Sequence, residues 1–360
     1  TVDEAIASDG LDILLQASEG IVVNRDVSSS GGTITVRAGT FVTMLDGTTM
    51  DAGSGTIDIL ATGDIGVSLV RTTGFVKIVT TGGSILDVDT TGALDVAGDS
   101  GELRAAGTIG TTANPLETDF RVTTGTTLVA GNGTVIVDAG DLLLSGSIST
   151  AGDIVVTAGG SLLLTGQLFA QGGDLILNAA GNLTLAEGSI STAGKRIVIT
   201  GGVVGATGPG GSVVTVLGTV RAQLIDITTG ARNDTVTFSP SALTGHVRIL
   251  TGAGDDLIVL DAVPSLDAAD KLVGSGPGAL INGTDAQGRP RNVLGVMLPL
   301  RDMIEVDGGA GSDTVRILLT ATQDNVFLVH DSGTSGVDRL EIVATAAAET
   351  FLVRANSITA

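Results

Sequence analysis

The chain has 360 residues, a net charge of −21, 54 glycines, and no cysteine, tryptophan or tyrosine. So acidic a chain lacks the clustered Lys and Arg that nucleic acids and anionic membranes require, which argues against both as partners. No stretch approaches the length of a membrane-spanning helix, so we expect no membrane insertion. Because 42% of the residues are hydrophobic but only 2% are aromatic, the core must consist of Val, Ile, Leu and Ala, which suit the narrow interior of stacked strands.

The predicted elements, taken along the chain, are short apolar runs separated by Gly, Asn, Asp and Thr. A three-residue core with an apolar residue at each end recurs at 11–13, 34–36, 57–59, 76–78, 94–96, 120–122, 135–137, 154–156, 175–177, 197–199, 236–238 and 257–259. Runs of this length with turn residues between them predict strands rather than helices.

The spacing of these strands indicates a repeat. The heptapeptide GSISTAG occurs at 146–152 and again at 188–194, and the strand cores beginning at 154, 175 and 197 lie 21 and 22 residues apart. A period of roughly 20 residues is one coil of a β-solenoid, in which each strand pairs with its equivalent one coil away. We therefore predict an all-β fold, a parallel β-solenoid (β-helix), right-handed, with roughly 17 coils if the whole chain takes part.

The repeat is interrupted between 262 and 303, a segment that holds four of the seven prolines and the only Arg cluster. We interpret 1–261 as the solenoid, 262–303 as an insertion or a joint between two β units, and 304–360 as a shorter C-terminal β-repeat unit. In this last part the period is 25 residues, because 312–329 is echoed at 337–353.

Units such as GDIVVTAGGSLLLTG (152–166) resemble the repeats of filamentous-haemagglutinin-like adhesins and of giant bacterial β-strand-repeat surface proteins. The segment IGTTANPLETD (109–119), with Asn114-Pro115-Leu116 at its centre, is similar to a recurrent turn in such proteins. The resemblance implies an extracellular or bacterial cell-surface location and a structural or adhesive role.

The sequence GGAGSDTV (308–315) is similar to the haemolysin-type calcium repeat, in which glycines allow a tight turn and an Asp completes an oxygen cage. The resemblance makes Asp313 a candidate calcium ligand, together with Asp255 and Asp256 of a partial copy and Asp234 of a degenerate one. Asp234 and Asp256 are one coil apart, so their loops should stack, whereas Asp313 has no such neighbour in sequence. The alternative is that these residues only form turns.

Enzyme function is not expected. β-solenoids include polysaccharide lyases and hydrolases, so the fold alone leaves that alternative open. A polysaccharide cleft normally offers Trp or Tyr platforms, however, and this chain has neither. The two histidines, His246 and His330, stand apart in the sequence and fit isolated surface or edge positions.

The middle residue of each strand core should point outward, because side chains alternate along a strand. In the early coils this residue is mostly polar, and Asp58, Lys77 and Asp95 alternate in sign as cross-strand neighbours should. Four later coils place apolar residues there instead, which predicts a lateral contact with a second copy or with the segment 262–303. The alternative is a wider cross-section that buries them. The predicted contact residues are Ile136, Val155, Ile176 and Val198.

We therefore expect a stiff extracellular rod, filament subunit or adhesin stalk that associates with itself laterally or end to end. A calcium-dependent adhesive module is the alternative among binding proteins, and a β-helical polysaccharide lyase or hydrolase is the alternative among enzymes.

Overall fold

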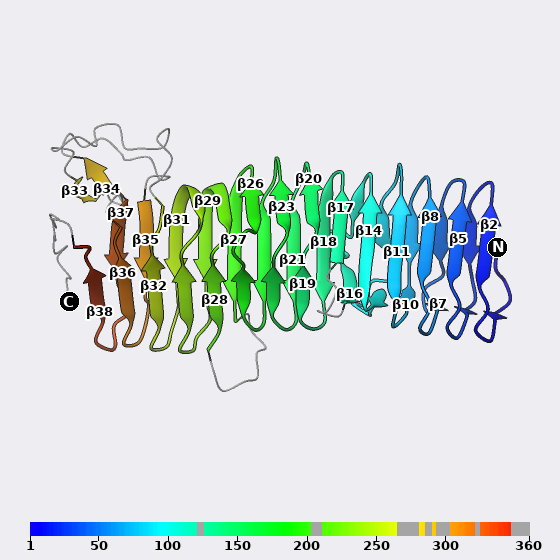
Figure 1. Ribbon diagram of the computed structural model, residues 1–360, viewed down its shortest axis with the longest axis horizontal. Helices are drawn as coiled ribbons and strands as arrows, with labels where there is room; N and C mark the ends of the chain where they lie inside the picture. Colours follow the sequence, from blue (N-terminus) through cyan, green and yellow to red (C-terminus); the bar gives the residue numbers. More distant parts are fainter. Residues whose placement is uncertain are drawn as a thin grey trace.

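The computed structural model is a rod of stacked coils, with β2 at one end and β38 at the other (Figure 1). It describes residues 1–120, 126–202, 211–264, 281–284, 290–292, 303–320 and 325–346. These residues form strands and turns and contain no helix. The parallel sheets make a β-solenoid of about 13 turns, fewer than the 17 expected from the chain length, because not every residue lies in a coil. Among the described residues no helix is long and apolar enough to cross a bilayer.

Each N-terminal coil contains three strands, and equivalent strands pair in parallel with those of the next coil. The longest strands stack as β2 (Ile13–Ala17), β5 (Ile34–Ala38), β8 (Ile57–Ala61), β11 (Phe75–Thr80), β14 (Ser100–Ala105) and β17 (Thr126–Ala130). The second stack contains β3 (Ile21–Val23), β6 (Val42–Met44), β9 (Ile65–Val67), β12 (Ile85–Asp87) and β15 (Thr108–Ile109). The third contains β1 (Ile6–Ala7), β4 (Val27–Ser28), β7 (Thr49–Asp51), β10 (Leu69–Arg71), β13 (Val96–Gly98) and β16 (Leu116–Phe120).

The cross-section changes at β18 (Gly133–Asp138), whose first residues pair with β15 and whose last residues pair with β16. The two short stacks thus become one long stack, and a new sheet begins with β19 (Leu142–Leu144). We call residues 85–120 the junction, because they precede this change.

Three stacks follow the junction. The long stack continues as β21 (Ile154–Ala158), β24 (Leu175–Ala179), β27 (Arg196–Gly201), and the second parts of β29 (Thr219–Thr228) and β31 (Ala242–Leu250). Beside it lie β20 (Ser147–Thr150), β23 (Gln167–Ala170), β26 (Ile190–Ala193) and the first parts of β29 and β31. The new sheet runs through β22 (Leu162–Leu164), β25 (Leu183–Leu185), β28 (Val213–Val216), β30 (Thr235–Phe238) and β32 (Leu257–Asp261).

The coils resume after the segment 262–303 on the same stacks. β35 (Met303–Asp307) pairs with β31, and β36 (Thr314–Leu318) pairs with β32. The next coil adds β37 (Val326–His330) and β38 (Arg339–Val343). Within the segment, β33 (Ile281–Thr284) and β34 (Pro290–Asn292) form an antiparallel pair, drawn beside the rod in Figure 1.

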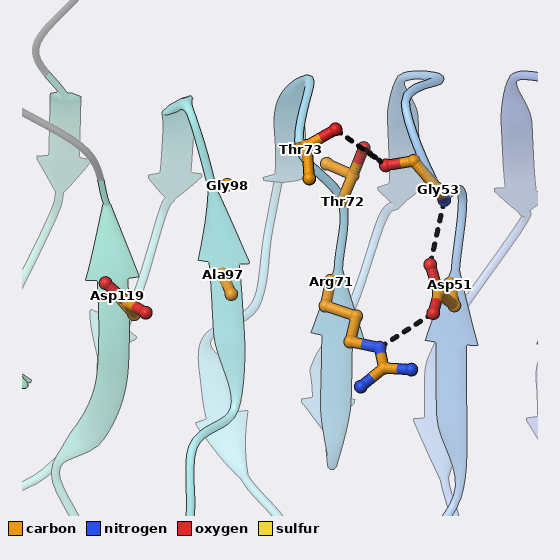
Figure 2. A pocket seen from close by; sticks show the side chains of 8 residues that line it. All are labelled: Asp51, Gly53, Arg71, Thr72, Thr73, Ala97, Gly98 and Asp119. Atoms are coloured by element: carbon orange, nitrogen blue, oxygen red, sulfur yellow. Dashed lines mark hydrogen bonds and ion pairs between the residues drawn. The ribbon is translucent and has the colours of Figure 1, made fainter. Parts of the chain in front are cut away.

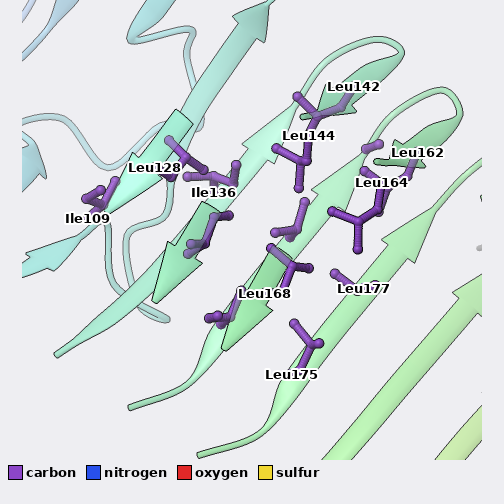
Figure 3. Packing of buried hydrophobic residues seen from close by; sticks show 14 of the residues in the cluster. Ile109, Leu128, Ile136, Leu142, Leu144, Leu162, Leu164, Leu168, Leu175 and Leu177 are labelled. Atoms are coloured by element: carbon purple, nitrogen blue, oxygen red, sulfur yellow. The ribbon is translucent and has the colours of Figure 1, made fainter. Parts of the chain in front are cut away.

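A single apolar interior runs through the rod. Alternate residues of each strand point inward, so that Ile34 and Val36 of β5, for example, are fully buried while Thr35 between them is not. Branched aliphatic side chains fill the interior, and identical types stack from coil to coil in places, as the Leu residues of β19 and β22 show in Figure 3. Burial of this continuous column is the main force that holds the coils together.

The sequence pattern predicted one series of equivalent strand cores, but these cores do not form a single stack. The cores at 34–36 and 76–78 lie in the first stack, the core at 154–156 lies in the long stack, and the core at 236–238 lies in the new sheet. The core at 11–13 was two residues early, because Ile13 pairs with Ile34. All faces of a coil use the same alternating pattern, so the pattern alone does not say which face a strand occupies. Of the core at 120–122, residues 121 and 122 lie outside the described residues.

Candidate functional site

The aspartates predicted as calcium ligands form a ladder along one corner of the last coils. The Oδ1 atom of Asp256 accepts the backbone N–H of Asp234 at 2.6 Å. Asp313 Oδ1 accepts the N–H of Asp256 at 2.9 Å, and Asp338 Oδ1 accepts that of Asp313 at 3.0 Å. Each carboxylate therefore satisfies a main-chain donor of the preceding coil, which is a structural role that needs no ion.

The prediction that Asp313 lacks a stacked neighbour was wrong. It stacks on Asp256 across 57 residues of sequence, because the segment 262–303 is inserted between two adjacent coils. The glycines of the motif also have a structural reason. A Cβ at Gly311, which has a φ of +147°, would lie 1.8 Å from the carbonyl oxygen of Gly254 in the coil before. Backbone therefore packs directly on backbone at this corner.

Asp255 points away from the ladder into solvent, and its Oδ1 accepts the N–H of Ser312 at 2.8 Å. Within the ladder, the Oδ2 atoms of Asp256 and Asp313 are buried without a partner. Burial raises the pKa of Asp256 to about 6 and also raises that of Asp313. The structure thus aligns Asp234, Asp256 and Asp313 but does not gather them around one point.

A second acidic group, which the sequence analysis missed, lies at the junction. Asp87 ends β12, Asp89 follows it in the turn, and Asp95 precedes β13. All three are buried, and one carboxylate oxygen from each lies within 4.8 Å of the others. Within the described part of the chain, this is the only place where three such ligand groups converge. We call Asp87, Asp89 and Asp95 the junction cluster.

Local hydrogen bonds fix the turn that carries the cluster. Asp87 Oδ1 accepts the N–H of Asp89 at 2.7 Å, and Asp89 Oδ1 accepts the N–H of Thr91 at 2.6 Å, so two Asx turns follow each other. Asn114 Nδ2 donates to the carbonyl oxygens of Asp87 and Asp89, at 3.3 and 2.5 Å. The resemblance drew attention to Asn114, and the structure shows that it holds the acidic turn in place.

Several carboxylate oxygens of this group have no partner. Asp87 Oδ2, Asp95 Oδ1 and Glu117 Oε2 are all buried and unpaired. Glu117 lies beside the cluster, and its backbone N–H donates to Asp95 Oδ2 at 3.0 Å. Burial, helped by the negative charges of Asp87 and Glu117, raises the pKa of Asp95 to about 9. Burial likewise raises the pKa values of Asp87 and Glu117.

Both histidines contact one carboxylate, so they are not isolated as predicted. Glu305 of β35 lies between the neighbouring strands, with His330 Nε2 at 3.1 Å from its Oε1 and His246 Nε2 at 3.6 Å from its Oε2. His246 is buried rather than on the surface. The contacts with His246 and His330 lower the pKa of Glu305, and the hydrogen bond with Glu305 raises the pKa of His330. This trio ties three coils together.

The predicted apolar column on the outer face is present in modified form. Val155, Ile176 and Val198 stack on one another and are half-buried, with their neighbours in each strand pointing inward. Ile136 was wrongly placed, because it is fully buried and pairs with Val156. Val135 takes the outward position beside Val155. We call Val135, Val155, Ile176 and Val198 the outer apolar column.

The column of alternating charges predicted for the early coils, Asp58, Lys77 and Asp95, differs from the structure in one residue. Lys77 stands between Asp58 and Glu102 in adjacent coils, and its Nζ lies 3.5 Å from Glu102 Oε2. Asp95, predicted at this place, is instead fully buried in the junction cluster. Arg37 forms an ion pair with Asp58 in the neighbouring coil. Alternating charge along the face is thus real, but Glu102 supplies the third charge.

A shallow recess lies on the third stack of the early coils (Figure 2). Arg71 Nε lies 2.7 Å from Asp51 Oδ2, and the N–H of Gly53 donates to Asp51 Oδ1 at 2.8 Å. Thr73 Oγ1 donates to the carbonyl of Gly53 at 3.1 Å. Both carboxylate oxygens of Asp51 therefore have a partner within the recess.

Comparison of the chain with protein-family models, with characterised proteins and with solved structures gave no match of any kind.

Proposed function

We propose that the chain is a structural rod of the bacterial cell surface, which serves as a filament subunit or as the stalk of an adhesin. The observation that carries this proposal is the unbroken parallel pairing from β1 to β38 around one apolar interior. In such a stack each coil contacts only its neighbours, so length can be added without altering the local structure. About 13 turns at roughly 4.8 Å per turn give a rod on the order of 60 Å long.

The surface supports a passive role. The recess in Figure 2 is shallow, and Asp51, Arg71 and Thr73 in it are held by an ion pair and hydrogen bonds. The chain contains no Trp or Tyr to bind a sugar ring. In this proposal the protein is not an enzyme. The surface location draws its support from the resemblance of the repeats to bacterial surface proteins and from the acidic, cysteine-free composition.

A deletion of whole coils tests the rod function. Ile154 and Ile197 occupy equivalent positions two coils apart in the long stack. Removing residues 154–196 joins Asp153 to Ile197 and should preserve every remaining pairing. The variant should fold and form a rod shorter by roughly 10 Å, measured by small-angle scattering or electron microscopy.

A control deletion of residues 154–166 removes β21 and β22 but keeps β23, which belongs to the same stack as β20, so the strands that follow no longer match their stacks and the region should unfold. If both deletions unfold the chain, or if purified protein is globular in micrographs, the coils are not modular spacers and the proposal fails.

A further inference from the structure

The junction cluster is the most unusual polar site in the described part of the chain. Asp95 is fully inaccessible to solvent, and Asp87 and Asp89 are 9% and 8% exposed. Carboxylates seldom occupy such positions unless each oxygen has a hydrogen bond, an ion pair or a metal. No ion pair among the described residues involves these three carboxylates or Glu117, so no Lys, Arg or His of that part neutralises them.

Asp138, a nearby buried carboxylate, provides a comparison within the molecule. It is also inaccessible to solvent, but its Oδ2 accepts from Thr118 Oγ1 at 3.0 Å and from the N–H of Phe120 at 3.1 Å. Its Oδ1 accepts the N–H of Gly140 at 3.0 Å. The fold can therefore satisfy a buried Asp completely with its own donors. At the junction cluster it leaves Asp87 Oδ2 and Asp95 Oδ1 without any donor.

One carboxylate oxygen from each of the three aspartates points to the same place. The three ligand atoms of the junction cluster lie within 4.8 Å of one another. Calcium takes oxygen ligands at about 2.4 Å, so three oxygens that lie this close together can all reach one ion between them. Glu117, next to Asp95, contributes a further unpaired oxygen at the rim.

We propose that Asp87, Asp89 and Asp95 bind a calcium ion, and that Glu117 completes its oxygen shell. Only oxygen ligands are present, which favours a hard cation, and an irregular turn suits the flexible geometry of calcium better than the strict octahedron of magnesium. The Asx turns and Asn114 fix the backbone of the loop before any ion binds. The carboxylates would otherwise have to share protons, as their raised pKa values indicate.

The bound ion would stabilise the change of cross-section. The turn 88–95 connects β12 to β13, and Glu117 belongs to β16, so the ligands come from two successive coils immediately before the short stacks merge. Cross-linking these coils through one ion would strengthen the place where the regular stacking is interrupted.

The test is calcium chloride titrated by calorimetry into full-length protein freed of metal with a chelator. The wild type should bind saturably, and calcium should raise its melting temperature. Asp95→Asn and Glu117→Gln should each weaken calcium binding at least tenfold and reduce the thermal shift. The matched control is Asp64→Asn, which removes one negative charge at an exposed turn. In the wild type, Asp64 Oδ1 accepts the N–H of Ser84. It should bind calcium like the wild type.

Glu117→Gln is included because Glu117 is only half-buried, so this variant should fold even if Asp95→Asn does not. Absence of saturable binding by the wild type at millimolar calcium would overturn the proposal. Undiminished binding by Glu117→Gln together with Asp87→Asn would also overturn it, because the ion would then lie elsewhere, for example at the C-terminal ladder. Equal loss in Asp64→Asn would assign the effect to net charge alone.

Discussion

The coils before the junction and the coils after it share one kind of interior but have different outer surfaces. Both bury alternate aliphatic residues of each strand. Outside, the early coils carry charged pairs between neighbouring coils, such as Arg37 with Asp58 and Lys77 with Glu102. The later coils carry the outer apolar column, bordered by polar side chains such as Thr157 and Asn178.

The difference shows that stacking depends on the inward residues, while the outward residues are free to vary. Charged pairs add specificity to the coil-to-coil register and keep the surface soluble. An apolar column adds nothing that the interior does not already provide, which suggests a contact with another surface. Buried carboxylates gather where the cross-section of one region changes into that of the other.

The largest change in stability is expected when a charged residue replaces an inward-pointing one at the start of the later coils. Ile136→Asp should destabilise these coils by several kcal/mol, because it buries an unpaired carboxylate in the apolar interior. Val135→Asp, one residue earlier, should change stability by only about 0.5 kcal/mol. Thermal melting followed by circular dichroism measures both. Equal effects of the two changes would contradict the assignment of faces.

The second prediction concerns how stability depends on pH at the junction cluster and at the C-terminal ladder of aspartates. The pKa of Asp95 rises from 3.8 to about 9 and that of Asp256 from 3.8 to about 6. A raised carboxyl pKa means that the folded chain keeps a proton that the unfolded chain has lost, so stability falls as pH rises from about 4 to the folded pKa. With chelator present, the melting temperature should therefore fall between pH 4 and pH 9, by roughly 5 °C or more.

The two aspartates separate this effect by pH range. Asp95→Asn should reduce the fall over the whole range from about pH 4 to pH 9, including the part above pH 6, whereas Asp256→Asn should reduce only the part below about pH 6. Melting curves at intervals of one pH unit distinguish them. A wild-type melting temperature that stays constant from pH 6.5 to 8.5 would show that Asp95 is not protonated in this range.

A smaller effect is expected from the charged column of the early coils. Asp58→Lys removes the partner of Arg37 and places a like charge beside Lys77. This should destabilise the early coils by about 1 kcal/mol at low salt and by less at high salt. Thr157→Lys in the later coils, where no such charge lies opposite in β18 or β24, is the control. A loss that is the same at both salt concentrations would exclude a charge effect.

The smallest effect on stability, and the largest on association, is expected at the outer apolar column. Val155→Lys together with Ile176→Lys should leave the melting temperature nearly unchanged but weaken lateral self-association, measured by sedimentation. Thr157→Lys with Asn178→Lys, on the adjacent outward positions, is the matched control. If the first pair unfolds the rod, these residues are not outward, and if the wild type stays monomeric over a wide concentration range, the column serves another purpose.

Much of the fold could be predicted from sequence because its signal is local and repeated. Alternating aliphatic residues and turn-forming Gly and Asp occur in every coil, so they predict parallel strands at a period near 20 residues. The candidate sites depended on longer distances. The stacking of Asp313 on Asp256 was hidden because they lie 57 positions apart in the sequence, and Glu305 meets His246 across the same inserted segment. For the junction cluster, the only local signal was the spacing Asp87, Asp89, Asp95, which many surface turns share.

The two copies of GSISTAG show that identical sequences can place different side chains in the interior. In the first copy Ile148 and Thr150 point inward, but in the second Ser189 and Ser191 are buried and Ile190 is not. The pairing explains this, because Ser147 is equivalent to Ile190, one residue beyond its sequence match Ser189.

Sequence by itself determined that each copy forms a strand with alternating faces. Only the tertiary structure decided which face is inside, because the turn around Gly188 and the additional residue before Ile197 set the register. A slip of one residue then exchanges the buried and exposed faces of the strand.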